Sequence, residues 1–263
     1  MIYNQLKSTI KKATPYYLRH LARRLGGFYD TMDGAPRREK FPSQEATFQT
    51  LSELGWRPKV CIDIGAYQGE WAKMFSSIFT EAQILMIEAQ ESKRPHLERA
   101  VVESHGKHSL EIALLGSEQG REVTFCEMET GSSVFEEQSH FPRVAVRKQL
   151  SSLDQILTKR TACAAPQCIK LDTQGYELEV LKGAQETLKK TDVVMMEVSF
   201  VRINRGCPPF AEVIAFMNQA GFGLFDICSQ IRRRDGVLWQ SDVLFIRVGG
   251  NIKIDARLTP ENW

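Results

Sequence analysis

The sequence lacks the features that mark several large classes of protein. No apolar run approaches the ~18–20 residues that span a bilayer, and the N-terminus has no continuous apolar stretch of the secretory-signal kind. With 10 Pro and 18 Gly in 263 residues, the chain is neither collagen-like nor of low complexity. Because 34 basic residues nearly balance 32 acidic ones, composition argues against a strongly basic nucleic-acid binder and against an acidic disordered chain.

Cysteine is scarce and scattered. None of the 6 cysteines forms a C-x-x-C pair, and a zinc site needs closely spaced ligands that this pattern does not supply. A disulfide framework is not expected in a chain of this length. We therefore expect reduced cysteines in a cytoplasmic protein.

The composition that remains, 43% hydrophobic and 25% charged, is that of an ordinary globular protein. Residues 1–24 are basic and contain no acid, and their apolar residues recur at near-helical spacing, which predicts two short helices. These helices would either pack on the main domain or in a dimer, or lie on the inner membrane surface. We expect a helical extension over residues 1–55, a main domain over 56–250 and a tail over 251–263.

Strands and helices alternate after residue 55. The predicted strands are 59–64, 83–88, 110–115, 168–172 and 193–198, and the predicted helices are 43–54, 70–79, 92–103, 152–157, 177–189 and 210–220. Short β segments are expected at 122–126, 134–135 and 144–148. The strands 224–228 and 243–248 are separated only by a polar loop, which predicts an antiparallel pair. This pattern predicts an α/β fold with a mostly parallel sheet, helices on both faces and an antiparallel hairpin at its C-terminal edge.

The first strand ends in an acid and a glycine turn, Asp63-Ile64-Gly65-Ala66-Tyr67-Gln68-Gly69. A dinucleotide fingerprint would place glycines where this chain has Tyr67 and Glu70, which argues against a nicotinamide oxidoreductase. The acid-x-Gly-x-x-x-Gly pattern resembles motif I of S-adenosylmethionine-dependent methyltransferases, with Tyr67 in place of the middle glycine. A plain strand-to-helix turn is the alternative.

Glu88 ends the second strand, about twenty residues further on. A carboxylate at this place can accept hydrogen bonds from both hydroxyls of a ribose, whatever adenosine cofactor is bound. The alternative is a solvated acid at the end of a strand. Together with Asp63 and Gly65, the position favours the ribose.

A second strand-turn-helix block reads Lys170-Leu171-Asp172-Thr173-Gln174-Gly175-Tyr176-Glu177, followed by Leu181-Lys182-Gly183-Ala184. The pattern K-x-D-x-x-G-x-E followed by L-x-G-A resembles the signature of the FkbM-family methyltransferases, and the resemblance covers roughly residues 58–248. It implies a Rossmann-like fold with a seven-stranded sheet, S-adenosylmethionine as donor and methylation of an acceptor hydroxyl. The acceptor would be a sugar of a glycan or glycolipid, or a polyketide or other natural product. Many members carry Glu where this chain has Gln174, which weakens that position as a base or metal ligand.

The same comparison proposes the site residues. The Gly131–Ser133 turn would contribute to donor binding, although it could equally be an ordinary turn. The residues that would bind the donor, from this turn and from the strand ends, are Asp63, Gly65, Ala66, Tyr67, Gly69, Glu88, Ala113, Leu114, Ser132, Ser133 and Asp172.

Asp172 is the best candidate for the catalytic base, because methyl transfer to an aliphatic hydroxyl needs help with deprotonation. Lys170 shares its side of the strand and would pair with it or orient the acceptor. Glu177 and His140 are rival bases, and Glu197 could help Asp172 hold a divalent ion, although no metal is indicated. Asp172 could instead cap the following helix. A non-catalytic interaction protein of the same fold is the alternative from another class, and the oligomeric state stays open.

Overall fold

The computed structural model describes residues 43–136, 142–160, 165–202 and 204–254. These residues fall in one compact unit, Pro42–Trp263. The predicted N-terminal helices, His140 and most of the predicted tail lie outside the described residues. Within the described part of the chain, no helix is long and apolar enough to cross a membrane.

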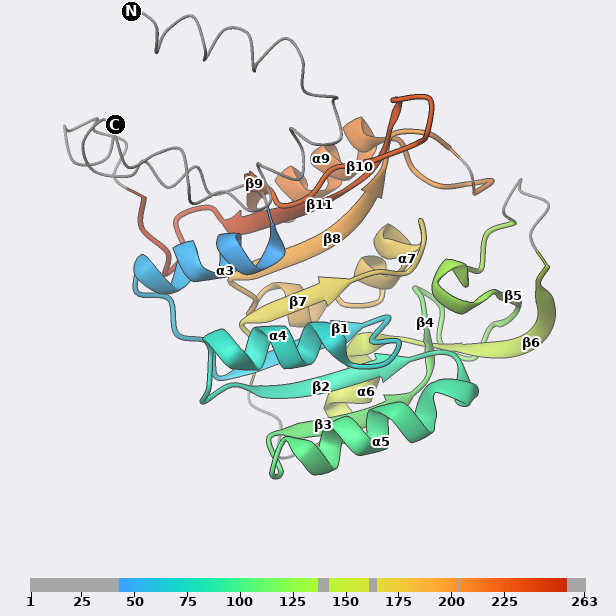
Figure 1. The fold of residues 1–263 in the computed structure, drawn as a ribbon, viewed down its shortest axis with the longest axis horizontal. Coiled ribbons are helices and arrows are strands. Elements are labelled where there is room, and N and C mark those ends of the chain that lie inside the picture. The colour runs from blue at the N-terminus through green and yellow to red at the C-terminus, as the bar shows by residue number, and fades with distance from the viewer. Residues whose placement is uncertain (1–42, 137–141, 161–164, 203, 255–263) are drawn as a thin grey trace, which may run out of the picture. The chain divides into compact units, whose positions relative to one another are not determined.

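The main sheet is eight-stranded and mostly parallel (Figure 1). Its parallel strands, in spatial order, are β3 (His108–Ile112), β2 (Gln83–Glu88), β1 (Val60–Ile64), β7 (Cys168–Leu171) and β8 (Val193–Ser199). The antiparallel strand β11 (Leu238–Arg247) follows β8, and it also pairs with β9 (Phe222–Ile227) and with the two-residue strand β10 (Ile231–Arg232). The predicted fold class, with its antiparallel C-terminal edge, is confirmed. The sheet has eight strands instead of the expected seven, because the short strand β10 adds to β11.

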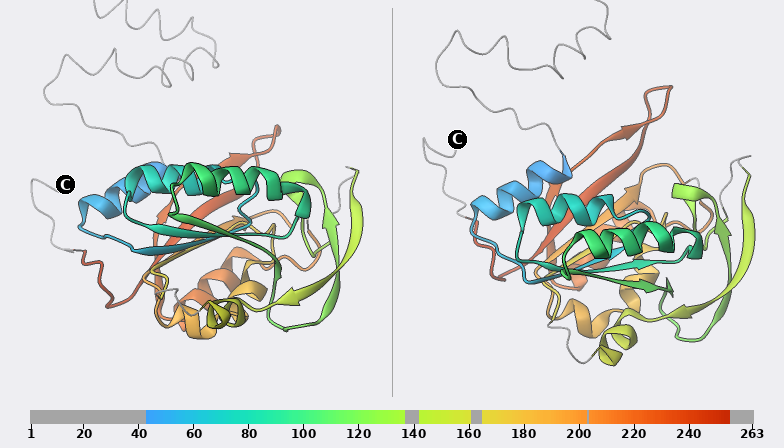
Figure 2. Two further views of the ribbon diagram at one scale, coloured as in Figure 1. Left: turned by 90° about the horizontal axis from the view of Figure 1, so that it is seen from below. Right: turned by 60° about the horizontal axis from the view of Figure 1, so that its bottom comes forward.

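Helices cover both faces of this sheet (Figure 2). One face carries α3 (Gln44–Glu53), α4 (Glu70–Ile78) and α5 (Arg94–Glu103), the last preceded by the 3-10 turn η1 (Glu91–Lys93). The other face carries α6 (Leu153–Lys159), α7 (Glu177–Lys182), α8 (Gln185–Leu188) and α9 (Phe210–Gln219). Successive side chains of a strand point to opposite faces of the sheet, so each strand contributes to two apolar cores. In β1, Cys61 belongs to the core under α4, whereas Ile62 and Ile64 belong to the core on the opposite face.

Helix α3 is anchored to α4 by aromatic packing. Ser43 caps α3 by accepting a hydrogen bond from the Ala46 amide at 3.0 Å. Phe48 is fully buried and meets Trp71 of α4 edge-to-face, with ring centroids 5.7 Å apart. This packing fixes the start of α4 and with it the loop that follows β1.

A smaller three-stranded sheet lies beyond the carboxyl ends of β1 and β2 (Figure 1). It consists of β4 (Leu114–Leu115), β6 (Val144–Ser151) and β5 (Glu122–Glu127), and the 3-10 turn η2 (Glu129–Gly131) follows β5. The sheet and its turn cover one side of the crevice at the strand ends.

Three sequence-based predictions need correction. The helix predicted over 177–189 is two helices, because Gly183 packs so closely on the Gly116 carbonyl that a Cβ would lie 2.2 Å from that oxygen. The strand predicted over 110–115 is divided at Ala113, where the chain leaves the main sheet for the smaller one. Residues 134–135 form no strand; the neighbouring Ser133 makes an isolated bridge to Cys126 instead.

Candidate functional site

A cavity of about 540 Å³ lies at the carboxyl ends of β1, β2 and β7, and the smaller sheet contributes to its wall. This volume is within the range that holds a cofactor or a drug-sized ligand. Its polar wall includes Glu88, Lys170 and Asp172, and its apolar wall includes Leu114 and Phe125. In a mostly parallel sheet, the carboxyl ends of the strands are the usual place for a ligand.

The loop after β1 is shaped by Gly65, which has a φ of +73°. A Cβ at Gly65 would lie 2.0 Å from the carbonyl oxygen of Asp172, so only glycine lets the end of β7 pack against this turn. The partner in this close backbone approach is the protein's own chain. Two residues later, Tyr67 also adopts a left-handed conformation, with φ of +50°, which is a strained one for a tyrosine.

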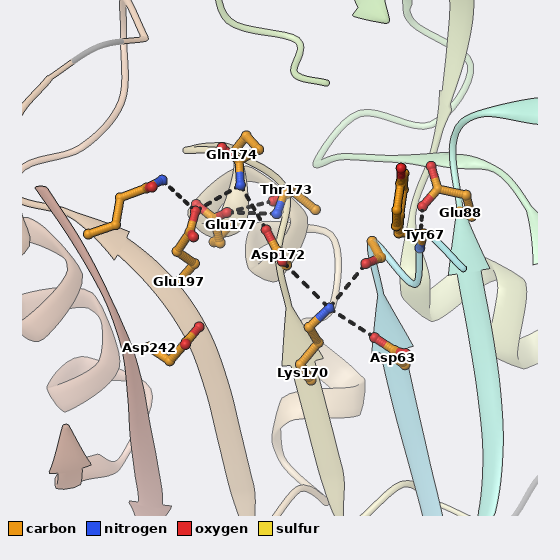
Figure 3. A network of polar contacts seen from close by, with 12 residues as sticks. Asp63, Tyr67, Glu88, Lys170, Asp172, Thr173, Gln174, Glu177, Glu197 and Asp242 are labelled. Atoms are coloured by element: carbon orange, nitrogen blue, oxygen red, sulfur yellow. Dashed lines mark hydrogen bonds and ion pairs between the residues drawn. The ribbon is translucent and has the colours of Figure 1, made fainter. Parts of the chain in front are cut away.

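The Glu88 carboxylate links this loop to β2. The side chain is 5% exposed, and its Oε2 accepts a hydrogen bond from the Tyr67 amide at 2.8 Å (Figure 3). Its Oε1 accepts another from the Gln90 amide at 2.9 Å. Since each carboxylate oxygen has two lone pairs, both oxygens keep acceptor capacity at the wall of the cavity.

Tyr67 and Glu129 line the same cavity, and Lys93 contacts both of them. The Tyr67 hydroxyl donates to Glu129 Oε2 at 2.8 Å, and the Lys93 ammonium donates to the same oxygen at 2.5 Å. Lys93 also lies over the tyrosine ring, 4.4 Å from its centroid. The hydrogen bonds from Lys93 and Tyr67 lower the pKa of Glu129. Sequence reasoning missed Lys93 and Glu129, because they are distant from Tyr67 in the chain and neither lies in a recognisable motif.

Asp63 and Lys170 form a buried ion pair on neighbouring strands. Lys170 Nζ lies 3.1 Å from Asp63 Oδ1 and donates to the Gly65 carbonyl at 3.0 Å (Figure 3). Burial opposes the charge of Lys170, but Asp63 and Asp172 outweigh it and raise the pKa of the ammonium. Asp63 is fully buried beneath the turn, and its carboxylate reaches Lys170 and not the cavity wall.

Asp172 follows β7 and lines the cavity, with 40% of its side chain exposed. Its Oδ1 accepts a hydrogen bond from Gln174 Nε2 at 2.9 Å, and its Oδ2 lies 3.9 Å from Lys170 Nζ. Lys170 and Asp172 thus lie on one side of the strand, as the period of two predicts, although Lys170 is closer to Asp63. Glu197, at the end of β8, accepts hydrogen bonds from Gln174 Nε2 at 2.8 Å and from Gln240 Nε2 at 2.6 Å. Burial, followed by the charges of Asp172 and Glu177, raises the pKa of Glu197.

Glu177 holds the turn that carries Asp172. It is 4% exposed, and its Oε1 accepts hydrogen bonds from the Thr173 amide, the Thr173 hydroxyl and the Gly175 amide at 2.8, 3.1 and 3.2 Å. Burial raises the pKa of Glu177 to about 7, although these hydrogen bonds favour the ionised form. Glu177 is not among the residues that line the cavity.

The remaining predicted residues divide between the cavity and its surroundings. Ala66, Ala113, Leu114 and Ser132 line the cavity. Ser133 is buried and donates to the Gln174 carbonyl at 2.9 Å, so it supports the turn after β7. Gly69 starts α4 and faces Ala100 of α5. The assigned roles of all these residues stay predictions.

No group of three or more potential metal ligands occurs among the described residues. Between Asp172 and Glu197, the pair named as a candidate metal site, the structure places the amide nitrogen of Gln174. In this structure both carboxylates accept a hydrogen bond from the same amide nitrogen. A metal-binding role for the pair stays a prediction.

Comparison with known proteins gives one family match. The family model described as the methyltransferase FkbM domain matches residues 63–224, which is more than half of the chain. No curated protein matches the chain.

Solved structures show likeness at low identity. The precorrin-6y C5,15-methyltransferase of Geobacter metallireducens GS-15 is 11% identical with a TM-score of 0.46, over 83% of this chain and 96% of that one. The methyltransferase FkbM of Methylobacillus flagellatus KT is 17% identical with a TM-score of 0.43, over 72% of this chain and 43% of that one. The 1,6-didemethyltoxoflavin-N1-methyltransferase of Burkholderia thailandensis, crystallised with 1,6-didemethyltoxoflavin and S-adenosylhomocysteine, is 10% identical with a TM-score of 0.43, over 77% of each chain.

Proposed function

Because the chain belongs to the FkbM methyltransferase family, we propose that it transfers a methyl group from S-adenosylmethionine to a hydroxyl group, that of a sugar in a glycan or glycolipid. The observation that carries this proposal is the presence of two carboxylates with different surroundings on the wall of one cavity. Glu88 is buried and held by backbone amides, whereas Asp172 is partly exposed.

The residues at the Glu88 side fit the adenosine part of the donor. The Glu88 oxygens retain lone pairs for two ribose hydroxyls, as predicted from the sequence. Ala113, Leu114 and Phe125 supply an apolar wall of the kind that an adenine ring requires. Gly65 and Ala66 bring backbone to the same cavity, so the chain can approach the donor closely.

The residues at the Asp172 side fit an acceptor with hydroxyl groups. Asp172 and Thr173 line the cavity here with a carboxylate and a hydroxyl, and Gln174 links Asp172 to Glu197 of β8, which Gln240 of β11 also contacts. Such groups bind hydroxyls by directed hydrogen bonds, which supports a saccharide more than a flat aromatic natural product. A polyketide or other natural product with an aliphatic hydroxyl is the second form of this proposal.

The chemistry follows from what the bound donor supplies, which is a methyl group already activated on a sulfonium. The protein has to hold the acceptor hydroxyl in line with that group and to accept its proton. Asp172 Oδ2 is the candidate acceptor of the proton, since Oδ1 already accepts a hydrogen bond from Gln174 and is therefore the less basic oxygen. The Lys170 ammonium nitrogen lies 3.9 Å from Oδ2.

The test is turnover with labelled S-adenosylmethionine against a panel of glycans and glycolipids. Asp172→Asn should lower turnover by about 10²–10⁴-fold, as loss of a general base does, while the affinity for S-adenosylhomocysteine and the folding are preserved. Asp235→Asn, on the exposed loop between β10 and β11, is the matched control. Near wild-type turnover of Asp172→Asn would remove Asp172 from the mechanism.

Ligand titrations, together with the turnover assay, separate a methyltransferase from the alternative functions. Binding of S-adenosylhomocysteine and not NADH supports a methyltransferase over an oxidoreductase. Binding without turnover on any acceptor would favour a non-catalytic interaction protein. Loss of turnover with a chelator, and recovery with magnesium, would support the metal version of the mechanism.

The basic N-terminal segment supports a second, separable hypothesis, that the protein contacts an anionic membrane surface. Flotation with anionic liposomes would compare the full chain with one that starts near Phe41. Equal behaviour of the two chains would reject this hypothesis.

A further inference from the structure

Gln174 joins Asp172, which lines the cavity, to Glu197 of β8. Its single amide nitrogen donates to Asp172 Oδ1 at 2.9 Å and to Glu197 Oε1 at 2.8 Å (Figure 3). The backbone of Gln174 is in the left-handed region, with φ of +53°, and its carbonyl accepts hydrogen bonds from Ser133 and Asn204. The residue is therefore held at both its main chain and its side chain.

The orientation of this amide is determined by its partners. Asp172 Oδ1 and Glu197 Oε1 both act as acceptors here, so the amide turns its NH₂ group toward them. Each hydrogen atom of the NH₂ group serves one carboxylate. Gln240 donates a further hydrogen bond to the same oxygen of Glu197, and Gln240 itself is only 6% exposed. Glu197 is thus fixed from β11 and in turn fixes the amide of Gln174.

Asp172 depends on this amide more than on any other described contact. Its side chain is 40% exposed, and its ion pair with Lys170, the only one it makes among the described residues, is long at 3.9 Å. Without the bond to Gln174, the carboxylate would be free to rotate into solvent. A shift of about 1 Å in a reacting group can lower a rate by about 10²-fold.

We propose that Gln174 is the positioning residue of the active site: its amide, oriented by Glu197 and Gln240, holds Asp172 with Oδ2 toward the acceptor hydroxyl. This inference rests on the proposed function, because it concerns the residue assigned there as the base. Gln174 itself takes no proton and touches no reacting atom. Its effect should appear in the rate of methyl transfer and not in the binding of the donor.

The experiment compares two variants with a control. Gln174→Met has nearly the same length and no donor, and Gln174→Asn keeps the amide but is one methylene too short to reach both carboxylates. Asparagine tolerates the left-handed backbone, so this variant should not strain the turn. Gln230→Met, on the exposed segment before β10, is the control.

The measurements are kcat, the KM for the acceptor, the affinity for S-adenosylhomocysteine and a crystal structure of Gln174→Met. We expect kcat to fall about 10–100-fold in both variants, with acceptor KM and donor affinity changed less than about 3-fold. Values of kcat within about 2-fold of the wild type would overturn the proposal, as would an equal loss of donor affinity, which would indicate a general disturbance of the site.

The crystal structure keeps this test separate from that of the proposed function. If the wild type methylates no acceptor, the function fails, and the position of the Asp172 side chain in Gln174→Met still decides the role of Gln174. A rotated Asp172 carboxylate supports the positioning role. An unchanged carboxylate contradicts it.

Discussion

Lys170 and Asp63 are partners across two strands that are far apart in the sequence and adjacent in the sheet. The parallel register places their Cα atoms opposite each other, and the ammonium nitrogen lies 3.1 Å from a carboxylate oxygen. Both side chains are buried, at 9% and 0% exposed. The pair ties the turn after β1 to the end of β7, and so joins two parts of the cavity wall.

Removing one member of this pair should destabilise the protein strongly. Lys170→Met leaves Asp63 buried without a counter-ion, which typically costs about 3–5 kcal/mol of unfolding free energy. The double variant Asp63→Asn, Lys170→Met should recover part of that loss. Lys182→Met, which breaks an exposed pair with Glu179, should cost less than about 1 kcal/mol. Urea unfolding of the three variants tests this order, and a Lys170→Met protein as stable as Lys182→Met would refute it.

Gly65 should tolerate no side chain, for two separable reasons. Gly65→Ala meets the Asp172 carbonyl and must also adopt a positive φ, whereas Gly55→Ala has a φ of +87° with open space around it. Gly55→Ala therefore measures the backbone strain alone, about 1–2 kcal/mol. Gly65→Ala should lose at least a further 1–3 kcal/mol through the forced movement of β7. Equal stability of the two variants in urea unfolding would show that the close packing at Gly65 does not contribute to the free energy of unfolding.

The raised pKa of Glu177 predicts that the stability of the protein depends on pH. This pKa is about 7 in the folded protein against an ordinary value of 4.5, so the folded state keeps a proton that the unfolded state loses between these values. The free energy of unfolding should then decrease as pH rises from about 4.5 to 7, by up to about 3 kcal/mol from this group. Glu177→Gln should flatten the profile in that window. Parallel profiles of wild type and variant, measured by urea unfolding at each pH, would show that Glu177 does not titrate there.

Much of the fold could be predicted from the sequence because its signals are local. From the alternation of apolar strands and amphipathic helices, both ends of β2 (Gln83–Glu88) were predicted correctly, and the ends of β1 and α4 were predicted to within one residue. The breaks in the predicted elements 110–115 and 177–189 were not predictable in this way. They arise where the chain meets distant residues, as Gly183 meets Gly116.

The candidate site could be predicted only where a motif carried it. Glu88 and Asp172 end strands of a recognisable pattern, and both line the cavity. The pairing of Lys170 with Asp63 depends on strand order and register, and the contact of Tyr67 with Glu129 depends on the fold of the smaller sheet. The role of Gln174 as a shared donor needs the positions of two other strands, so the sequence showed only its difference from the usual glutamate.

The central claim is that this cavity binds S-adenosylmethionine through Glu88, and calorimetric titration with S-adenosylhomocysteine tests it most directly. Hydrogen bonds to a carboxylate contribute about 1.5–3 kcal/mol, so Glu88→Ala should weaken binding at least roughly tenfold. Glu91→Ala, an exposed acid on the neighbouring turn, should leave the affinity unchanged. Binding by the wild type that Glu88→Ala weakens tenfold or more is the predicted result; no binding by the wild type, or equal affinity in Glu88→Ala, would contradict the claim.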